Sequence, residues 1–336
     1  MDDAPGPTTF APTAAGARRD PALSPPDDGR LRGSDTAARA FALIAKSALN
    51  QIAANAAVLR EARRLEAVHQ LRVGLRRLRG ALSLFEPMLA GPGHALIKAE
   101  LKWLTGELND ARNIDVFITE SFRPAARRHR DWPGMAALGK VLLAAQTKAY
   151  DRAQTAARSA RFGVLMIEAG AWIDAGDWSQ DPAPETAALR ERPIGAVAPE
   201  LLADSLKKVV KRGRKLETLD PEARHRLRLR AKRLRYATAF FADLYKDEAP
   251  KAYRRFNKAI QRLQDALGAQ TDLAAAAALA AEIAGVGVAG VGSDRQAPAV
   301  AFAAGLVAAE RAAAEAAAEA ASLKAYARFR EAERFW

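Results

Sequence analysis

Apolar residues recur through most of the chain at the three- and four-residue spacing of amphipathic helices. Between residues 34 and 64, for example, Phe41, Ile44 and Ile52 fall near one side of a helix. Runs of β-branched residues are short and rarely alternate with polar ones, so the sequence gives little sign of strands. The pattern therefore predicts an all-α protein.

Glycine, proline and short polar turns divide this pattern into separate predicted helices. Ser34 and Asp35 are expected to cap the first helix, and Asp220-Pro221-Glu222 is a typical helix start. A polar turn is expected at 109–113 and a Gly-rich loop at 285–296. The predicted helices cover approximately residues 34–64, 66–89, 94–108, 114–122, 134–158, 161–175, 199–216, 221–245, 250–267, 272–284 and 298 to the end.

Composition suggests how these helices are grouped. Residues 1–33 are rich in Pro, Ala and Gly and show no period, so they are predicted to form a disordered tail. Residues 181–198 carry prolines and are expected to link two helical halves, 34–180 and 199–336.

A basic motif occurs twice, once in each half. Residues 68–79 read VHQLRVGLRRLR, and residues 224–235 read RHRLRLRAKRLR, so that His, Leu and Arg recur in register. Phe85 and Phe241 keep the same offset from their motifs. The repeat predicts an internal duplication and two similar helical bundles.

On a helical wheel, each motif has an apolar stripe with a row of cations beside it. Leu71, Leu75 and Leu78 belong to the first stripe. No acidic residue lies inside either motif, although a solvated face usually carries acids one turn away. A solvated face, or salt bridges with other helices, is the alternative interpretation, but the occurrence in both copies favours a bound polyanion. The rows are His69, Arg72, Arg76 and Arg79, and His225, Arg228, Lys232 and Arg235.

The overall charge agrees with such a partner. The 336 residues include 52 Lys and Arg against 39 Asp and Glu, a formal net charge of +13, which favours a polyanionic ligand. Cysteine is absent, which excludes disulfides, thiolate metal sites and a cysteine nucleophile. The start of the chain resembles no signal peptide, and the Ala- and Gly-rich stretch 273–292 is a poor membrane span. A cytoplasmic protein without a membrane partner is expected.

The motif pair resembles the CHAD family of histidine-containing, all-helical domains. The resemblance covers about residues 34–336 and implies two pseudo-symmetric four-helix bundles that face each other across a basic groove or pore. It also implies binding of inorganic polyphosphate, often at polyphosphate granules, without established catalysis. The residues that carry it are 68–85, 224–241, Leu101-Lys102-Trp103-Leu104 through Leu108, and Ala111-Arg112-Asn113-Ile114-Asp115-Val116.

The resemblance also implies a set of polyphosphate ligands. The two cationic rows named above form its centre. Four residues of neighbouring helices extend it, namely Lys102, Arg112, Lys258 and Arg262. Lys211, Arg212 and Arg214 precede the second motif and are expected to line the same groove. Catalytic residues, metal ligands and cofactors are not expected.

Three other functions compete with polyphosphate binding. Nucleic acid binding through phosphates is the strongest alternative, but residues 60–79 and 207–235 contain no aromatic side chain for base stacking. A phosphatase would need metal-holding carboxylates, or a nucleophile with a base. Glu107, Asp110 and Asp115 are the one acidic cluster near a turn, and caps and salt bridges explain them better.

The remaining alternative is a scaffold that binds partners through the Ala-rich C-terminal helix. Packing of this helix on its own bundle is the simpler interpretation, and the terminal Phe335 and Trp336 favour docking. The sequence Gly285-Val286-Gly287-Val288-Ala289-Gly290 matches a dinucleotide-binding pattern by its letters alone. It lacks a preceding strand and is therefore expected to be a loop.

Overall fold

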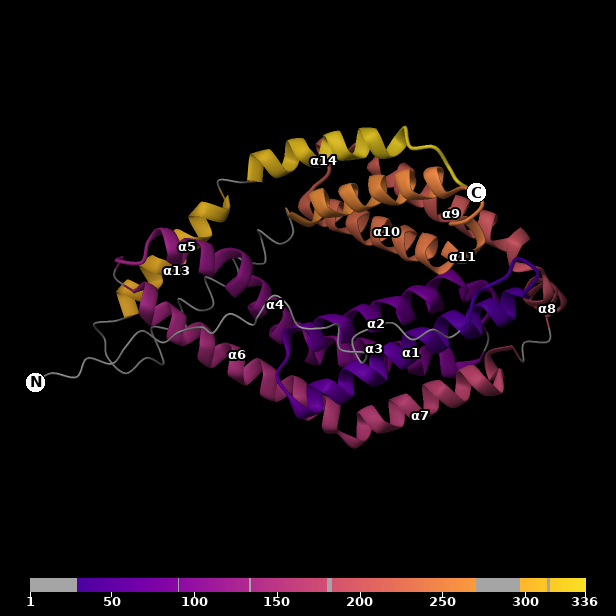
Figure 1. Cartoon of the computed structure of the whole chain (residues 1–336), viewed down its shortest axis with the longest axis horizontal. Helices are drawn as coiled ribbons and strands as arrows, with labels where there is room; N and C mark the ends of the chain where they lie inside the picture. The colour runs from indigo at the N-terminus through magenta and orange to yellow at the C-terminus, as the bar shows by residue number, and fades with distance from the viewer. Residues whose placement is uncertain (1–28, 90, 133, 180–182, 270–296, 313–314) are drawn as a thin grey trace, which may run out of the picture.

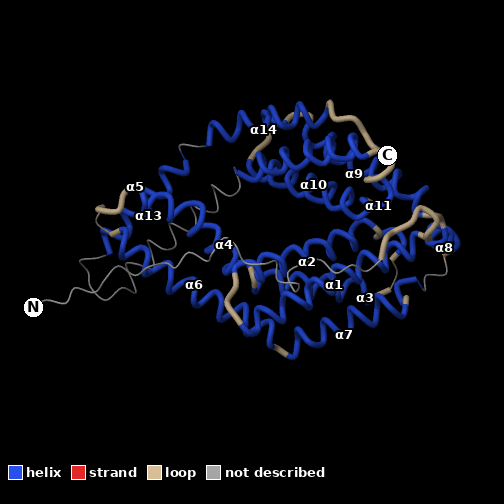
Figure 2. The backbone as a smooth tube through the Cα atoms, viewed as in Figure 1, coloured by secondary structure: helices blue, strands red, loops and turns tan. Residues whose placement is uncertain are grey.

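The structure is a computed structural model that describes residues 29–89, 91–132, 134–179, 183–269, 297–312 and 315–336. Within these ranges every regular element is a helix, and the sole β contact is an isolated bridge between Thr36 and Pro193 (Figure 2). The predicted all-α class is confirmed.

The helices follow one another along the chain with short connections. They are α1 (Ala37–Glu61), α2 (Leu65–Leu84), α3 (Pro92–Glu107), α4 (Asn109–Phe117), α5 (Arg123–Arg128), α6 (Met135–Arg158), α7 (Ala160–Ala175), α8 (Pro184–Glu191), α9 (Ile194–Gly213), α10 (Pro221–Phe240), α11 (Ala242–Tyr245), a helix over residues 250–269, α13 (Ala297–Ala312) and α14 (Glu315–Arg330). A π-helical turn, Ile118–Phe122, joins α4 to α5.

The helices form two groups (Figure 1). Helices α1, α2, α3 and α7 lie together in the lower part of the view, and α9, α10, the helix over 250–269 and α14 lie in the upper part. Helices α4, α5, α6 and α13 extend the structure at one end. The two groups meet where the rings of Phe85 and Phe241 contact each other edge to face, with centroids 6.1 Å apart. A continuous apolar core therefore runs from one group into the other.

The ends of several helices follow from local sequence signals. Asp220 accepts a hydrogen bond from the backbone N–H of Ala223 at 2.6 Å, and Pro221 follows it, which confirms the expected start of α10. The expected cap of α1 is wrong, because Thr36 is the cap residue and accepts from the N–H of Arg39 at 3.1 Å. Asp35 instead accepts from the N–H of Arg32.

The start of α1 is displaced because the preceding segment pairs with another part of the chain. The N–H of Ala37 donates to the carbonyl of Arg192 at 2.9 Å, and the N–H of Ile194 donates to the carbonyl of Asp35 at 2.7 Å. These bonds join the start of α1 to the start of α9, two places 157 residues apart in sequence (194 − 37).

Two connections differ from the expected ones. The segment 181–198 contains α8 and the first turn of α9, since Pro184 can occupy the first position of a helix and buried Arg190 donates to the carbonyl of Met88. The polar turn expected at 109–113 is wrong, because α4 begins at Asn109 directly after Leu108. The division into two domains stays a prediction.

Some expectations concern residues outside the described ranges. These are residues 1–28 of the expected tail, the whole helix expected at 272–284, and the Gly-rich loop at 285–296 with its dinucleotide-like sequence. The end of the expected tail is packed, because Leu31 is buried and its N–H donates to Asp243. The C-terminus also packs on its own bundle, where Phe335 and Trp336 contact Phe256.

Helix α1 is long and apolar enough, by length and composition alone, to cross a membrane. Half of its most apolar window is buried inside the protein, so that this helix forms part of the core. Its buried residues, among them Phe41, Ile52 and Leu59, pack against the rest of the core.

The closest approach of α1 and α2 generates a first prediction. A methyl group at Gly74 would lie 2.9 Å from Cγ1 and 3.2 Å from the backbone nitrogen of Ile52, and 3.3 Å from the carbonyl oxygen of Ala48. We expect Gly74→Ala to lower the free energy of unfolding by about 1–3 kcal/mol because the helices must move apart. Urea unfolding followed by circular dichroism measures the change.

Gly106→Ala is the matched control, since Gly106 is also helical and a methyl group there meets nothing within 4 Å. It should raise the free energy of unfolding by about 0.5–1 kcal/mol through helix propensity. Equal effects of the two substitutions would contradict the proposed close packing.

Candidate functional site

The two helices that carry the basic motifs, α2 and α10, lie next to each other. Their contacts follow the same order along both helices. Arg76 Nε donates to the hydroxyl of Tyr236 at 3.1 Å, and Phe85 meets Phe241. Between them, the Cβ position of Gly80 lies 3.7 Å from Tyr236 and Phe240. The helices therefore run parallel and touch over their C-terminal halves.

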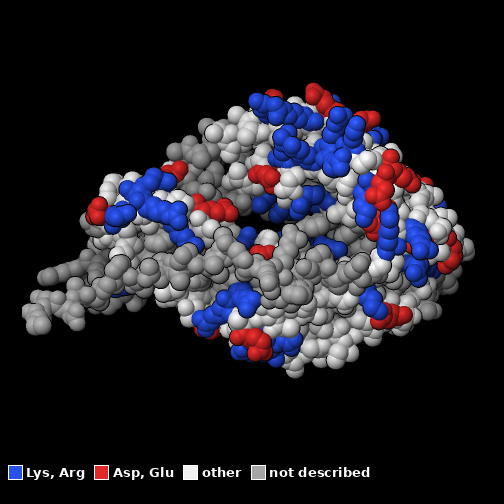
Figure 3. Space-filling view, viewed as in Figure 1, with Lys and Arg blue, Asp and Glu red and all other residues white. Residues whose placement is uncertain are grey.

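A hollow is visible between the two groups of helices (Figure 3). Lys and Arg atoms lie on its upper and lower walls, and a few Asp and Glu atoms lie at its edge. Each motif helix is held beside it by its own apolar stripe, because Leu71, Leu75 and Leu78 of α2 and Leu227 and Leu234 of α10 are buried.

Four cationic or ionisable groups of the first motif and of α4 form one cluster, which we call the Arg72 cluster: His69, Arg72, Arg76 and Arg112. Burial, followed by the neighbouring charges of Arg76 and Arg112, lowers the pKa of Arg72 to about 10. Burial and the charge of Arg112 also lower the pKa of His69, and Glu66 is the one acid that opposes this shift. The pKa shifts of both residues show that like charges have been brought together in a partly desolvated place.

The arginines of the predicted site are held mainly by neutral partners. Arg72 donates to the side-chain oxygen of Asn109 and to the carbonyl of Thr105, the second at 3.4 Å. Arg235 Nη1 donates to Oε1 of Gln261 at 2.7 Å. An amide, carbonyl or hydroxyl oxygen orients a guanidinium group without cancelling its charge, so the positive charge remains for an external anion.

Several nitrogen atoms of these residues are buried without a hydrogen-bond partner. In the part of the chain that the structure describes, Nδ1 of His69 and Nε of Arg72 and of Arg235 have no hydrogen bond. Buried polar atoms of folded proteins are nearly always bonded, so each of these atoms marks a place where a ligand or water completes the structure.

The side chains of the second motif lie in different surroundings, unlike those of the Arg72 cluster. The guanidinium group of Arg228 lies against Gly268, with Nη2 3.4 Å from the Cβ position of that glycine. His225 is exposed, unlike His69. The pKa of Arg233 is lowered by burial first, then by the charge of Arg230, and then by the charge of Arg79. Arg79 of the first motif therefore lies close to Arg233.

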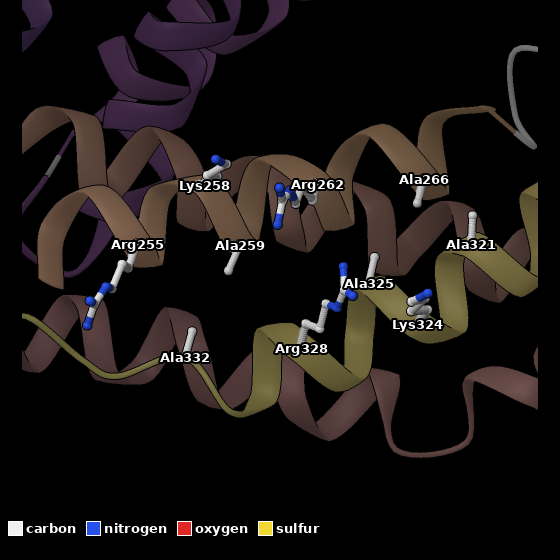
Figure 4. Close-up of a pocket in the computed structure, with 10 residues that line it drawn as sticks. All are labelled: Arg255, Lys258, Ala259, Arg262, Ala266, Ala321, Lys324, Ala325, Arg328 and Ala332. Carbon is white, nitrogen blue, oxygen red and sulfur yellow. The ribbon is translucent and has the colours of Figure 1, made fainter. Parts of the chain in front are cut away.

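Apart from Arg112, the residues predicted to extend the site lie in three different places. Lys102 is exposed on α3. Lys211 and Arg212 are exposed at the C-terminal end of α9. Arg214 follows them and lies near Tyr326 of α14. Burial raises the pKa of Tyr326, and the charges of Arg330 and Arg214 oppose that rise. Lys258 and Arg262 line a separate groove against α14 (Figure 4). Of this extending set, the contacts above connect Arg112 alone to the Arg72 cluster.

Comparison with known proteins identifies the family. The sequence profile of the CHAD domain matches residues 43–281, well over half of the chain. The chain belongs to the CHAD family. The crystal structure of the CHAD domain from the plant Ricinus communis is similar, with 29% sequence identity, a TM-score of 0.73, and coverage of 89% of this chain and 95% of that one.

PptA from Streptomyces chartreusis shares the fold, with 22% identity, a TM-score of 0.60, and coverage of 87% of this chain and 100% of that one. A comparison with curated proteins gives no match. The CHAD family is associated with polyphosphate. The all-helical fold that the resemblance implies is confirmed.

The acidic cluster of this CHAD domain has structural partners. Glu107 and Asp110 both form ion pairs with Arg152 of α6. Asp115 is buried and accepts hydrogen bonds from the hydroxyl of Tyr150 and the amide of Gln146, each at 2.7 Å. Burial raises the pKa of Asp115, although both of these donors lower it. Among the described residues, no three His, Asp or Glu side chains gather in a way that could hold a metal ion.

Sequence reasoning missed the neutral partners of the CHAD motif, namely Asn109, Tyr236 and Gln261. Tyr236 had a detectable signal, because it directly follows the last arginine of the second motif. Gln261 and Asn109 had none, since a lone amide in a helical pattern does not indicate which arginine it will meet.

The lowered pKa of His69 generates a second prediction. Because the folded state holds this proton less tightly than the unfolded state, the unfolded chain binds more protons as the pH falls below about 6.5, and stability is lost. We expect the melting temperature of the unliganded protein to fall between about pH 7.5 and pH 5.5, and to fall less in His69→Gln.

Burial and the charge of Lys98 also lower the pKa of His94. His94 therefore accounts for part of the pH dependence of the melting temperature that remains in His69→Gln. His225→Gln, at the exposed histidine of the second motif, is the matched control, because it removes an imidazole from the repeated motif and leaves His69 in place. A slope that is the same in His69→Gln and in the wild type would contradict this assignment.

Proposed function

We propose that this CHAD domain binds inorganic polyphosphate, without catalysis, at the Arg72 cluster and the facing cations of α10. The observation that carries the proposal is the chemistry of the partners. Arg72, Arg76 and Arg235 are positioned by amide, carbonyl or hydroxyl oxygens and, within the described part of the chain, by no carboxylate. Guanidinium groups arranged in this way bind phosphoryl oxygens with charge-assisted hydrogen bonds.

Polyphosphate fits these groups because it offers charge at every unit and no bases. The contact between Arg76 and Tyr236 brings both motif helices within reach of one extended anion. The buried, unpartnered Nε–H groups of Arg72 and Arg235 supply places for additional phosphoryl oxygens, as does Nδ1 of His69 in the tautomer that carries its proton there. Binding at a polyphosphate granule in the cytoplasm is the cellular role that this chemistry supports.

Nucleic acid is the second candidate, and one observation favours it. Tyr236 places an aromatic ring beside Arg235, with the guanidinium carbon 5.5 Å from the ring centroid. A base stacked on such a ring would gain about 1–3 kcal/mol. Against it, the hydroxyl of Tyr236 is bonded to Arg76 and its ring lies near Phe240, so that the ring is already part of the helix contact.

The third prediction tests the site directly. Arg72→Glu combined with Arg228→Glu should weaken the binding of polyphosphate of defined length at least about 100-fold, because two charge-assisted contacts of about 1.5–3 kcal/mol each are lost. Titration calorimetry measures the affinity, and far-UV circular dichroism verifies that helicity is intact.

Arg127→Glu combined with Arg130→Glu is the matched control, since both residues are exposed near the end of α5 and the net charge changes by the same amount. This control should change the affinity less than about 3-fold at physiological salt. Comparable losses in both double variants would mean that net charge alone binds the ligand.

The fourth prediction concerns salt and competition. The logarithm of the binding constant should fall linearly with the logarithm of salt concentration, with a slope of about −0.7 per phosphate contact for a flexible chain. At equal phosphate concentration, polyphosphate should displace labelled single-stranded DNA. Displacement in the opposite direction would reject polyphosphate in favour of the second candidate.

A further inference from the structure

A second basic surface lies outside the Arg72 cluster. The helix over 250–269 and α14 enclose a groove of about 540 Å³ (Figure 4). Five of its lining residues are cations, and the lining contains no Asp or Glu. We call this surface the α14 groove, and its cations are Arg255, Lys258, Arg262, Lys324 and Arg328.

The two helices that line the groove are antiparallel. In Figure 4, Arg255 lies near Ala332 at one end, and Ala266 lies near Ala321 at the other. The distance along a helix from residue 255 to residue 266 is about 16 Å, which corresponds to three helical turns. The side chains of Arg262 and Arg328 extend toward each other across the middle of the groove.

At two other helix contacts of this protein, a cation is paired with an acid of the neighbouring helix. Arg161 of α7 pairs with Glu100 of α3 at 2.6 Å, and Lys46 of α1 pairs with Asp174 of α7 at 2.9 Å. In the α14 groove, like charges instead face each other across the gap. These cations are exposed, so solvent screens part of their repulsion, and a bound external anion would offset the remainder.

The floor of the groove is apolar and made entirely of small side chains. All five lining residues that are not cations are alanines: Ala259, Ala266, Ala321, Ala325 and Ala332. No lining residue carries a hydroxyl or amide group. In this respect the groove differs from the Arg72 cluster, where Asn109, Tyr236 and Gln261 orient the arginines.

This difference determines the class of ligand. A bare phosphate chain is hydrated on every side and gains nothing from an alanine floor. An amphipathic helix does gain, because small residues let a third helix approach two others closely while its apolar stripe leaves water. The cations at both rims then meet carboxylates on the two flanks of that helix.

We infer that the α14 groove docks an acidic amphipathic helix of a partner protein, about three turns long, with small apolar residues in its central stripe and Glu or Asp on both flanks. This inference does not depend on what the Arg72 cluster binds. On the helix over 250–269, Gln261 and Asn257 face α10, whereas Ala259, Arg262 and Ala266 face α14. The partner and the ligand of the Arg72 cluster therefore occupy different sides of this helix.

The probe for the test is a synthetic, fluorescently labelled helical peptide with an Ala and Leu stripe flanked by Glu. A second peptide has the same composition in scrambled order, so that its charge is equal and its amphipathic pattern is lost. Fluorescence anisotropy with the full chain should show saturable binding of the patterned peptide, at least about 10-fold tighter than that of the scrambled one.

Two variants locate the binding. Arg262→Glu combined with Arg328→Glu should weaken the patterned peptide at least about 10-fold by reversing the charge of the groove. Ala325→Gln keeps the charge and fills the floor, and should weaken the peptide about 5-fold or more while leaving polyphosphate affinity unchanged. Arg72→Glu combined with Arg228→Glu should leave peptide binding unchanged, which separates this inference from the proposed function.

Three results would overturn the inference. Equal affinity for both peptides would show that charge alone is recognised. Absence of binding of the patterned peptide up to about 1 mM would show that the groove has no such specificity. Displacement of the peptide by polyphosphate, together with an equal loss of polyphosphate binding in Arg262→Glu with Arg328→Glu, would make the groove a phosphate site.

Discussion

Mutual repulsion of guanidinium groups that are held together without carboxylates is the constraint on which this structure depends. Burial, together with the neighbouring charges of Arg76 and Arg112, lowers the pKa of Arg72 to about 10. Such an arrangement is unfavourable in the absence of a ligand, so the rest of the fold has to hold it in place. The buried leucines of α2 and α10 do so, because each cation row sits beside an apolar stripe that cannot leave the core.

The aromatic contact between Phe85 and Phe241 transmits this restraint from one helix group to the other. Phe85 also lies 5.7 Å from Phe41 of α1, so a chain of rings extends from the first helix to the end of α10. Offset or edge-to-face ring pairs contribute about 0.5–1.5 kcal/mol each beyond their buried area. The positions of the cations are therefore determined by core packing at a distance from them. Polar partners such as Asn109 and Gln261 then orient the guanidinium groups.

The sequence alone predicted the features that depend on a single helix, but it did not predict the contacts between helices. The leucine stripe, the row of cations beside it and the Asp220-Pro221 start follow from helical spacing and capping, and the structure contains all three. The contact of Arg76 with Tyr236 joins residues 160 positions apart, and no local rule connects them. The location of Lys258 and Arg262 could not be predicted either. Tertiary packing sets the rotation of their helix about its axis, and this rotation turns both residues toward α14. The shift of the α1 cap to Thr36 likewise depends on a distant segment.

The pairing of residues 33–37 with residues 192–195 has a consequence for any attempt to divide this protein. The bonds from Ala37 to Arg192, from Ile194 to Asp35 and from Gly195 to Gly33 tie the beginnings of α1 and α9 into one short ribbon. A fragment that ended before α8 would leave the amide of Ala37 and the carbonyls of Gly33 and Asp35 without these protein partners, and would expose Phe85 where Phe241 now covers it. Either half produced by itself would thus begin with a frayed end and a bare aromatic surface, which favours self-association over a soluble monomer.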